Sequence, residues 1–466
     1  MRDSKRVIDP FHTKLGLSAL SLCILLSSLS TSIANIALPQ LASHFGTNMQ
    51  AVQWVLLAYL LAITTLIVSV GRMGDVVGRR RLLLLGLAVF AVASCLCALA
   101  TRLPYLIAAR AVQGVGAAIM MALGMALAAE TVGKPKLGRA MGLLGSMSAL
   151  GTALGPTLGG LLLAHLGWQA LFYGMLPFII AAAWLAYRYL PKEFASPAQH
   201  NSPFDWLGTV LLAGTLAAYA VAMTGTHNGG AWKNIGLLLI AIVGLVLFLI
   251  VESQLVAPLM PIKLLRHRDL GSSFVMSALV TTVVMASLVV GPFYLSTAFD
   301  LGPAQVGLVM STGPIVAALT GLPAGRLVGH WGASTMVKVG LVSMGVGSAF
   351  LPILADLFAV TGYIASLLLI TAGYALFQAA NNTAVMQVRA LGQSGLLAGL
   401  LNLARNLGLI TGASLMGRVF AMGSMYAQQG SAMATGLQWT FTLAAILIAI
   451  AFLIAYCSQK AATASK

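Results

Sequence analysis

Charged residues are scarce in this chain. Only 8% of its 466 residues are Asp, Glu, Lys or Arg, against about 25% in a soluble globular protein. Acidic residues are the rarest, with 10 against 26 basic ones, and the net charge is +16. Because 59% of the residues are hydrophobic, this composition excludes a soluble domain. It favours basic loops on one side of a membrane over nucleic-acid binding as the cause of the basic excess.

Groups that carry enzyme chemistry are also missing. The sequence has no His-Glu-x-x-His motif, no paired aspartates in an apolar run, no phosphate-binding loop and no Ser-His-Asp set at membrane depth. The cysteines lie in apolar runs without metal-ligand neighbours, which favours simple packing over disulfides or metal binding. We therefore expect no enzyme, no ATP-driven pump, no cofactor and no metal site. The four cysteines are Cys23, Cys95, Cys97 and Cys457.

Apolar runs of membrane-spanning length fill the chain. A helical span needs about 20 mostly apolar residues, and fourteen segments joined by short loops meet this requirement. The first run, from Leu15 to Leu38, is longer than a signal-peptide core of roughly 7–15 residues, so we interpret it as an uncleaved span. The sequence thus predicts an all-α polytopic membrane protein. The segments begin near Leu15, Ala51, Leu82, Pro104, Gly138, Trp168, Phe204, Trp232, Gly271, Pro303, Ser334, Thr361, Gly395 and Gly436.

The distribution of basic residues agrees with fourteen spans. With the N-terminus placed in the cytoplasm, all but five of the 26 Lys and Arg fall in cytoplasmic segments. Arg102 and Lys233 fall in outer loops, whereas Arg110, Arg405 and Arg418 lie within spans. A wrong number of spans would scramble this asymmetry. The bias therefore supports fourteen helices with both termini in the cytoplasm.

A weak internal repeat divides the spans. GRMGDVVG at Gly71–Gly78 follows span 2, and GRLVGHWG at Gly325–Gly332 follows span 10. Repeated helical bundles are typical of secondary transporters. The repeat predicts six spans, an inserted pair and six further spans.

The first copy continues as GRMGDVVGRRR, a loop rich in glycine and arginine. Its glycines allow a tight turn, and its carboxylate suits a helix N-terminus. The pattern resembles the loop 2–3 signature of the major facilitator superfamily, which implies a latch between two bundles. The alternative is a charge cluster that only sets topology. The predicted latch residues are Gly71, Gly74, Asp75, Gly78, Arg79 and Arg80.

Span 4 carries a charge inside the membrane. It reads RAVQGVGAA from Arg110, with Gln113 on the same helical face. Arg110 lies about 10 Å deep at 1.5 Å per residue, and an arginine at the centre of a span costs about 2.5–3.5 kcal/mol. We expect Arg110 to face a bundle interior or a wet cavity; the alternative is an arginine neutralised by backbone carbonyls. The motif is similar to the fourth-helix signature of the same superfamily.

Span 5 reads GTALGPTLGG and presents a smooth face. Gly151, Gly155 and Gly159 recur at every fourth residue, and Pro156 removes a backbone donor. Small residues permit close helix contact in lipid, which alone would explain the glycines. With Gly-Pro at this place and Gly160 after it, the run resembles the fifth-helix signature of the exporters in the superfamily. The resemblance implies transport out of the cell.

FDWLG at the head of span 7 and GLLNLARNLG in span 13 resemble the fourteen-span drug:proton antiporter branch. That branch carries an aspartate in span 1, associated with proton coupling and cationic drugs. Here Ser30 stands at that position, whereas Asn35 and Pro39 match the family pattern. No acidic residue is predicted at the bilayer centre. A cavity with Arg110 and Arg405 would therefore suit an anionic or zwitterionic substrate, which is a second hypothesis.

Polar residues within the spans are candidates for the cavity wall. The alternative is interhelical hydrogen bonding, worth roughly 0.6 kcal/mol per bond in a membrane. The candidates are Ser30, Asn35, Tyr59, Arg110, Gln378, Asn381, Asn402 and Arg405.

The resemblance implies a secondary transporter of the multidrug efflux type. It would act as a monomer in the cytoplasmic (inner) membrane, export small amphiphilic molecules or drugs in exchange for protons, and bind no nucleic acid. Alternatives are an exporter of an anionic metabolite, an uncoupled facilitator, and a sensor built on a transporter fold. The expected segments are a cytoplasmic N-terminus (1–14), a six-helix bundle (15–190), a linker (191–203), two inserted spans (204–253), a loop (254–270), a second six-helix bundle (271–457) and a tail (458–466).

Overall fold

The protein is built from helices. The computed structural model describes residues 10–132, 137–190, 206–224, 231–254, 268–387, 394–426 and 432–464, and within these ranges it contains no strand. Eleven of the described helical stretches are long and apolar enough to cross a membrane. The predicted class of all-α polytopic membrane protein is thus confirmed, whereas the number of fourteen spans stays a prediction.

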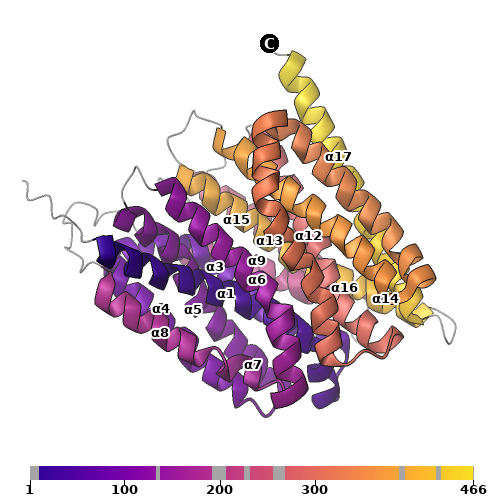
Figure 1. The fold of residues 1–466 in the computed structure, drawn as a ribbon, viewed down its shortest axis with the longest axis horizontal. Helices are drawn as coiled ribbons and strands as arrows, with labels where there is room; N and C mark the ends of the chain where they lie inside the picture. The colour runs from indigo at the N-terminus through magenta and orange to yellow at the C-terminus, as the bar shows by residue number, and fades with distance from the viewer. Residues whose placement is uncertain are drawn as a thin grey trace, which may run out of the picture.

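The N-terminal helix group contains α1 to α8, which pack mainly on one another. Helix α1 lies against α6, and both α3 and α4 lie against α5. Figure 1 shows this group in indigo to magenta. Its members are α1 (Pro10–His44), α2 (Met49–Val52), α3 (Trp54–Val77), α4 (Arg79–Ala98), α5 (Leu103–Val132), α6 (Leu137–Leu166), α7 (Ala170–Tyr173) and α8 (Leu176–Tyr189).

The C-terminal helix group contains α12 to α17, coloured from salmon to yellow in Figure 1. Helix α12 packs on α15 and α17, and α14 packs on α13 and α17. Helices α15 and α16 are joined through a single π-helical turn, η5, so they form one continuous helical run. The members are α12 (Arg268–Ala298), α13 (Pro303–Trp331), α14 (Ala333–Gln387), α15 (Ser394–Thr411), η5 (Gly412–Met416), α16 (Gly417–Tyr426) and α17 (Ala432–Ala464).

The two copies of the sequence repeat end in the same backbone turn. Gly78, between α3 and α4, has a φ of 102°, and Gly332, between α13 and α14, has a φ of 83°. Such values favour glycine because a Cβ would be strained there. The Gly78 amide donates to the carbonyl of Gly74 and the Gly332 amide to that of Val328, each at 3.0 Å. The repeat is therefore a structural repeat at this position. We call the end of the molecule that holds the α3–α4 turn and Arg79 to Arg81 the basic end.

Helix α14 is a hairpin of two helices. Ala359 has a φ of 49°, which breaks the helix into residues 333–358 and 360–387. The two parts run antiparallel, since Gly340 lies against Gly373 and Gly347 against Ile370. The long apolar stretch between α13 and α15 therefore forms two antiparallel helices.

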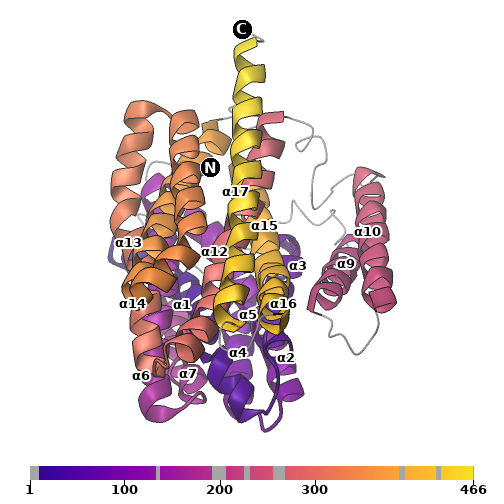
Figure 2. The ribbon, with the colours of Figure 1, turned by 90° about the vertical axis from the view of Figure 1, so that its right-hand side faces the viewer.

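The inserted helices α9 (Trp206–Thr224) and α10 (Ala231–Gln254) pack on each other at the edge of the molecule (Figure 2). Leu212 and Leu216 of α9 cluster with Phe248 of α10, and Leu61 of α3 and Leu407 of α15 pack against this cluster. The pair thus covers the line along which the two helix groups meet.

Candidate functional site

The two helix groups are in backbone contact between α6 and α13. A Cβ on Gly160 would lie 2.9 Å from the Cα of Gly307, and one on Gly307 would lie 2.5 Å from the carbonyl of Pro156. Beside this contact the hydroxyls of Thr157 and Ser311 are 2.5 Å apart. Because these residues lie late in α6 and early in α13, the groups are closed on each other at the end opposite the basic end. Small residues are what permits such an approach.

The other glycines of the span 5 motif face α1. A Cβ on Gly151 or Gly155 would collide with the backbone or side chains of α1, and one on Gly159 would lie 3.0 Å from Ile33. The hydroxyl of Ser32 in α1 donates to the carbonyl of Thr152 at 2.8 Å. The motif therefore serves two contacts, with α1 inside its own group and with α13 across the boundary.

Arg110 of α5 is held in a fully buried network. Its Nε donates to the carbonyl of Val55 at 3.0 Å, and its Nη1 donates to Ser30 Oγ at 2.8 Å and to Gln113 Oε1 at 2.5 Å. Its Nη2 reaches the carbonyl of Ser30 at 3.3 Å. The guanidinium carbon also lies 4.2 Å from the ring centroid of Tyr59, a favourable cation–π distance. Each of these acceptors is uncharged.

A second arginine lies on a polar face between α14 and α15. Arg405 reaches the hydroxyl of Tyr374 at 3.5 Å. With the Gln378 amide oriented so that its oxygen faces Arg405, that oxygen accepts from Nη1 and Nη2 at 3.0 and 3.2 Å. All the polar residues of this face keep part of their surface exposed, unlike Arg110. We call them the Arg405 stripe: Tyr374, Gln378, Asn382, Asn402, Arg405 and Asn406.

Asn381 does not belong to this stripe, although it was predicted to share its face. Its side chain is only 1% exposed, and its Nδ2 donates to the carbonyl of Ser273 in α12 at 3.2 Å. It lines a pocket at the basic end of the C-terminal group. A rotation of about 60° separates positions three apart on a helix, which is enough to turn Gln378 to α15 and Asn381 to α12.

The sequence model described as the Major Facilitator Superfamily matches residues 20–413 and 273–464. The chain belongs to the major facilitator superfamily. It is 30% identical over 409 residues to the riboflavin transporter RibZ of Clostridioides difficile (strain 630), covering 87% of this chain and 88% of RibZ. It is 28% identical over 413 residues to the multidrug efflux pump LfrA of Mycolicibacterium smegmatis, covering 88% and 81%.

The fold agrees with this membership. A bacterial homologue of the human lysosomal transporter Spinster, solved in an inward-facing and unoccupied conformation, matches with a TM-score of 0.69 and 15% identity, over 97% of this chain and 98% of that one. The family and its relatives confirm the prediction of a superfamily transporter of the drug-efflux type. This superfamily member is a multi-pass membrane protein.

In this superfamily member the described part of the predicted latch contacts its own helix group. Arg80 donates to the carbonyl of Tyr187 in α8, and its guanidinium lies 5.4 Å from the ring centroid of Tyr187. A Cβ on Gly74 would lie 2.6 Å from the side chain of Leu123 in α5. The side chain of Asp75 and the surroundings of Gly71 are not among the described parts of the structure. The latch role of these two residues therefore stays a prediction.

The predicted cavity residues of the N-terminal group do not line open space in this conformation. Ser30, Tyr59 and Arg110 have no exposed surface, and Asn35 is 1% exposed. The reason is that the guanidinium is compensated by carbonyl, hydroxyl and amide oxygens and an aromatic face, as burial of a charge requires. In this conformation Arg110 is neutralised within the packing, and the cavity role of these residues stays a prediction.

Some residues that build these contacts were not predicted from the sequence. Gly307 and Ser311 carry the α13 side of the boundary, and Tyr374 completes the Arg405 stripe. Tyr374 lies four residues before Gln378, so the helical period placed it on the same face. No comparable signal marked Gly307, because its partner Gly160 is far away in the sequence. Among the described residues, no group of three or more His, Cys, Asp and Glu side chains could hold a metal ion.

Proposed function

We propose that this protein exports small amphiphilic molecules or drugs across the cytoplasmic membrane by alternating access. The observation that carries the proposal is the backbone contact of Gly160 with Gly307. It joins the exporter-like motif of α6 to the other helix group at one end, through residues small enough for the two helices to slide or part. The multidrug efflux pump and the riboflavin transporter among the relatives support a small organic substrate.

The proposal includes fourteen spans with both termini in the cytoplasm, and bundles at 15–190 and 271–457 with spans 7 and 8 between them. The α14 hairpin supports this count, because it supplies two antiparallel helices. The arginines at the basic end support a cytoplasmic position for that end. With that orientation the α6–α13 contact closes the outer side.

Exchange for protons is part of the proposal, through a group other than the one in the family pattern. The Ser30 hydroxyl neither releases nor takes up a proton at physiological pH, and it serves Arg110 as a neutral acceptor. An acid elsewhere in the chain would have to take over this role. An uncoupled facilitator is the form that the transporter would take without such an acid.

A second candidate substrate class is an organic anion or zwitterion. The observation that favours it is Arg405, which is partly exposed and contacts the neutral side chains of Tyr374 and Gln378. Arg110 was expected to share this role, but its donors are taken by Val55, Ser30 and Gln113. Arg405 is therefore the arginine that an anion would meet.

Purified protein in sealed liposomes with an internal pH dye tests these proposals. A pH gradient is imposed, and lipophilic cations, organic anions and neutral amphiphiles are added in turn. Proton movement with cations or neutral amphiphiles supports drug:proton exchange, and movement with anions alone supports the Arg405 candidate. Labelled substrate that crosses without a proton signal indicates a facilitator. The absence of flux for every class would contradict transport and favour a sensor.

The matched control uses two substitutions on α6. Gly160→Val fills the contact with Gly307, whereas Leu161→Val changes a side chain that is 44% exposed on the outside of the bundle. We expect flux to be lost in Gly160→Val and kept in Leu161→Val. Equal flux in both variants would contradict the proposed movement at this boundary.

A further inference from the structure

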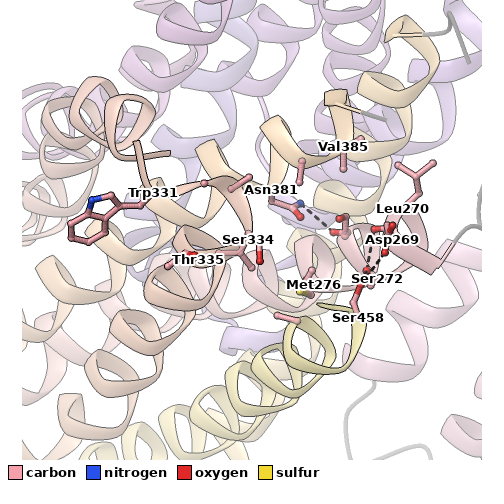
Figure 3. A pocket seen from close by; sticks show the side chains of 16 residues that line it. Asp269, Leu270, Ser272, Met276, Trp331, Ser334, Thr335, Asn381, Val385 and Ser458 are labelled. Atoms are coloured by element: carbon pink, nitrogen blue, oxygen red, sulfur yellow. Dashed lines mark hydrogen bonds between the residues drawn. The ribbon is translucent and has the colours of Figure 1, made fainter. Parts of the chain in front are cut away.

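A pocket of about 450 Å³ lies at the basic end of the C-terminal helix group, on a different face of α14 from the Arg405 stripe. The start of α12, the α13–α14 turn, the end of α14 and the end of α17 enclose it. Figure 3 shows Asp269 and Ser458 on one side, Ser334 and Thr335 on another, and Asn381 between them. All of these residues belong to one helix group, so the pocket does not depend on the boundary between the groups.

Two hydrogen-bond acceptors of this pocket can bind a further donor. Asp269 is exposed and its carboxylate accepts from the hydroxyl of Ser458 at 3.2 Å. Asn381 is 1% exposed and uses its Nδ2 on Ser273, while its Oδ1 has no hydrogen-bond partner. A buried acceptor without a donor is costly. A carboxylate and an unpaired amide oxygen in the same pocket suit a cationic donor, because charge-assisted hydrogen bonds are the stronger ones.

The internal repeat indicates which cation fits. Gly78 and Gly332 end the two copies with the same positive φ and the same capping bond. Counting from these glycines, Ser334 occupies in α14 the position that Arg80 occupies in α4. Helix α4 packs on α8 as α14 packs on α17. The two first turns are therefore equivalent places in the two helix groups.

In the N-terminal group this place is filled by a guanidinium. Arg80 is 9% exposed, donates to the carbonyl of Tyr187 in the last turn of α8, and lies against its ring. In the C-terminal group the Ser334 side chain is too short to reach α17 as Arg80 reaches α8, and Ser334 lines the pocket. Asp269 and Asn381 supply the acceptors there.

We propose that this pocket binds a small organic cation with a guanidinium or primary ammonium head, which donates to the Asp269 carboxylate and to Asn381 Oδ1. The head would take the place that the Arg80 side chain takes in the other helix group. A soluble cation and the headgroup of an ethanolamine lipid share this chemistry. Of the predicted cavity residues only Asn381 lines this pocket, and the Arg405 stripe lies on another face of α14, so the site does not depend on the proposed function.

The test measures binding of n-butylguanidinium to the purified full-length protein in detergent by ligand-observed NMR. We expect saturable binding, weakened about tenfold or more in Asp269→Asn and in Asn381→Ala, because each removes one acceptor. Ser334→Arg supplies the arginine of the other repeat and is expected to abolish binding by filling the pocket. The control is Asp356→Asn, at an exposed acid beside the break of the α14 hairpin that does not line the pocket. This variant is expected to bind as the unmodified protein does. Thermal unfolding verifies that each variant is folded.

A second arm distinguishes the two sources of the cation. The protein is placed in nanodiscs of phosphatidylethanolamine or of phosphatidylcholine, whose quaternary ammonium has no hydrogen to donate. Loss of n-butylguanidinium binding only in phosphatidylethanolamine assigns the pocket to a lipid headgroup, and equal binding in both assigns it to a soluble cation. The proposal is overturned by the absence of saturable binding in detergent, or by binding that Asp269→Asn and Ser334→Arg both leave unchanged.

Discussion

Ser30 Oγ in α1 lies 2.8 Å from Arg110 Nη1 in α5, and both residues have no exposed surface. The position where the family pattern has an aspartate thus holds a hydroxyl that accepts from a buried guanidinium. A hydroxyl can hold the arginine in place, but it cannot exchange a proton for a substrate. Ser30 therefore keeps the structural role of this position, which is to hold Arg110, and lacks the proton-coupling role of the aspartate in the family pattern.

Ser30→Asp is expected to convert this contact into an ion pair. The carboxylate supplies the counter-ion that the neutral acceptors of the buried guanidinium lack, so we expect a higher melting temperature of the purified protein. We also expect substrate-dependent proton movement in liposomes to appear or increase. Ser30→Asn, which adds similar volume without charge, is the control. If both variants melt and transport alike, the charge at this position has no role.

Arg110→Ala is expected to destabilise the protein by about 3 kcal/mol or more. It leaves the carbonyls of Val55 and Ser30 without their donor and empties a packed site next to Tyr59. Thermal unfolding in detergent measures the loss. Arg102→Ala, at an exposed residue of a loop, is expected to change stability by less than about 0.5 kcal/mol. A stable Arg110→Ala protein that fails to transport would instead return Arg110 to the substrate cavity.

Thr157→Cys combined with Ser311→Cys is expected to form a disulfide across the two helix groups. The hydroxyls are 2.5 Å apart, which brings the two Cβ atoms close to the separation that a disulfide needs. Cys457 is exposed and is replaced by serine in this background. We expect oxidation to stop transport and a reductant to restore it, because the bond would hold the two groups closed at the end opposite the basic end. Each single cysteine variant should transport normally under both conditions.

Arg405→Gln is expected to lower the flux of organic anions at least tenfold and to leave neutral substrates within about twofold. The reason is that the substitution removes the one charge of the Arg405 stripe and keeps polar volume there. A matched control is Arg418→Gln, since Arg418 donates to the carbonyl of Ala222 in α9 at 3.0 Å instead of facing the stripe. Liposome flux with labelled substrates of each class measures the difference. Equal losses for anionic and neutral substrates would exclude a charge-based role for Arg405.

Much of the architecture could be predicted because it depends on local properties. The apolar runs and the scarcity of charge are enough to predict a polytopic helical protein. The glycines of the first copy predicted a turn, and Gly78 adopts the positive φ that favours glycine, as does Gly332 at the end of the second copy. The predicted start of a span near Thr361 also agrees with the break at Ala359.

The candidate site was predictable only in its residue types. Arg110, Gln378, Asn381 and Arg405 were recognisable as polar residues in apolar spans, but the helical period could not assign their partners. Gln378 and Asn381, three residues apart, turn to different helices. The packing of α9 and α10 over the line between α3 and α15 was likewise open, since an apolar helix surface fits many neighbours.

The sequence by itself determined the membrane class, the helix positions, the repeat and the superfamily motifs, because composition, period and glycine turns act over a few residues. Only the tertiary structure decided that Arg110 is neutralised by residues of α1, α3 and α5 and that Gly160 meets Gly307 across the boundary. It also decided that Ser334 leaves open the place that Arg80 fills. The partners of Arg110 in α1 and α3 and the partner of Gly160 lie tens to more than a hundred residues away in the sequence, and these contacts are fixed by how whole helices pack.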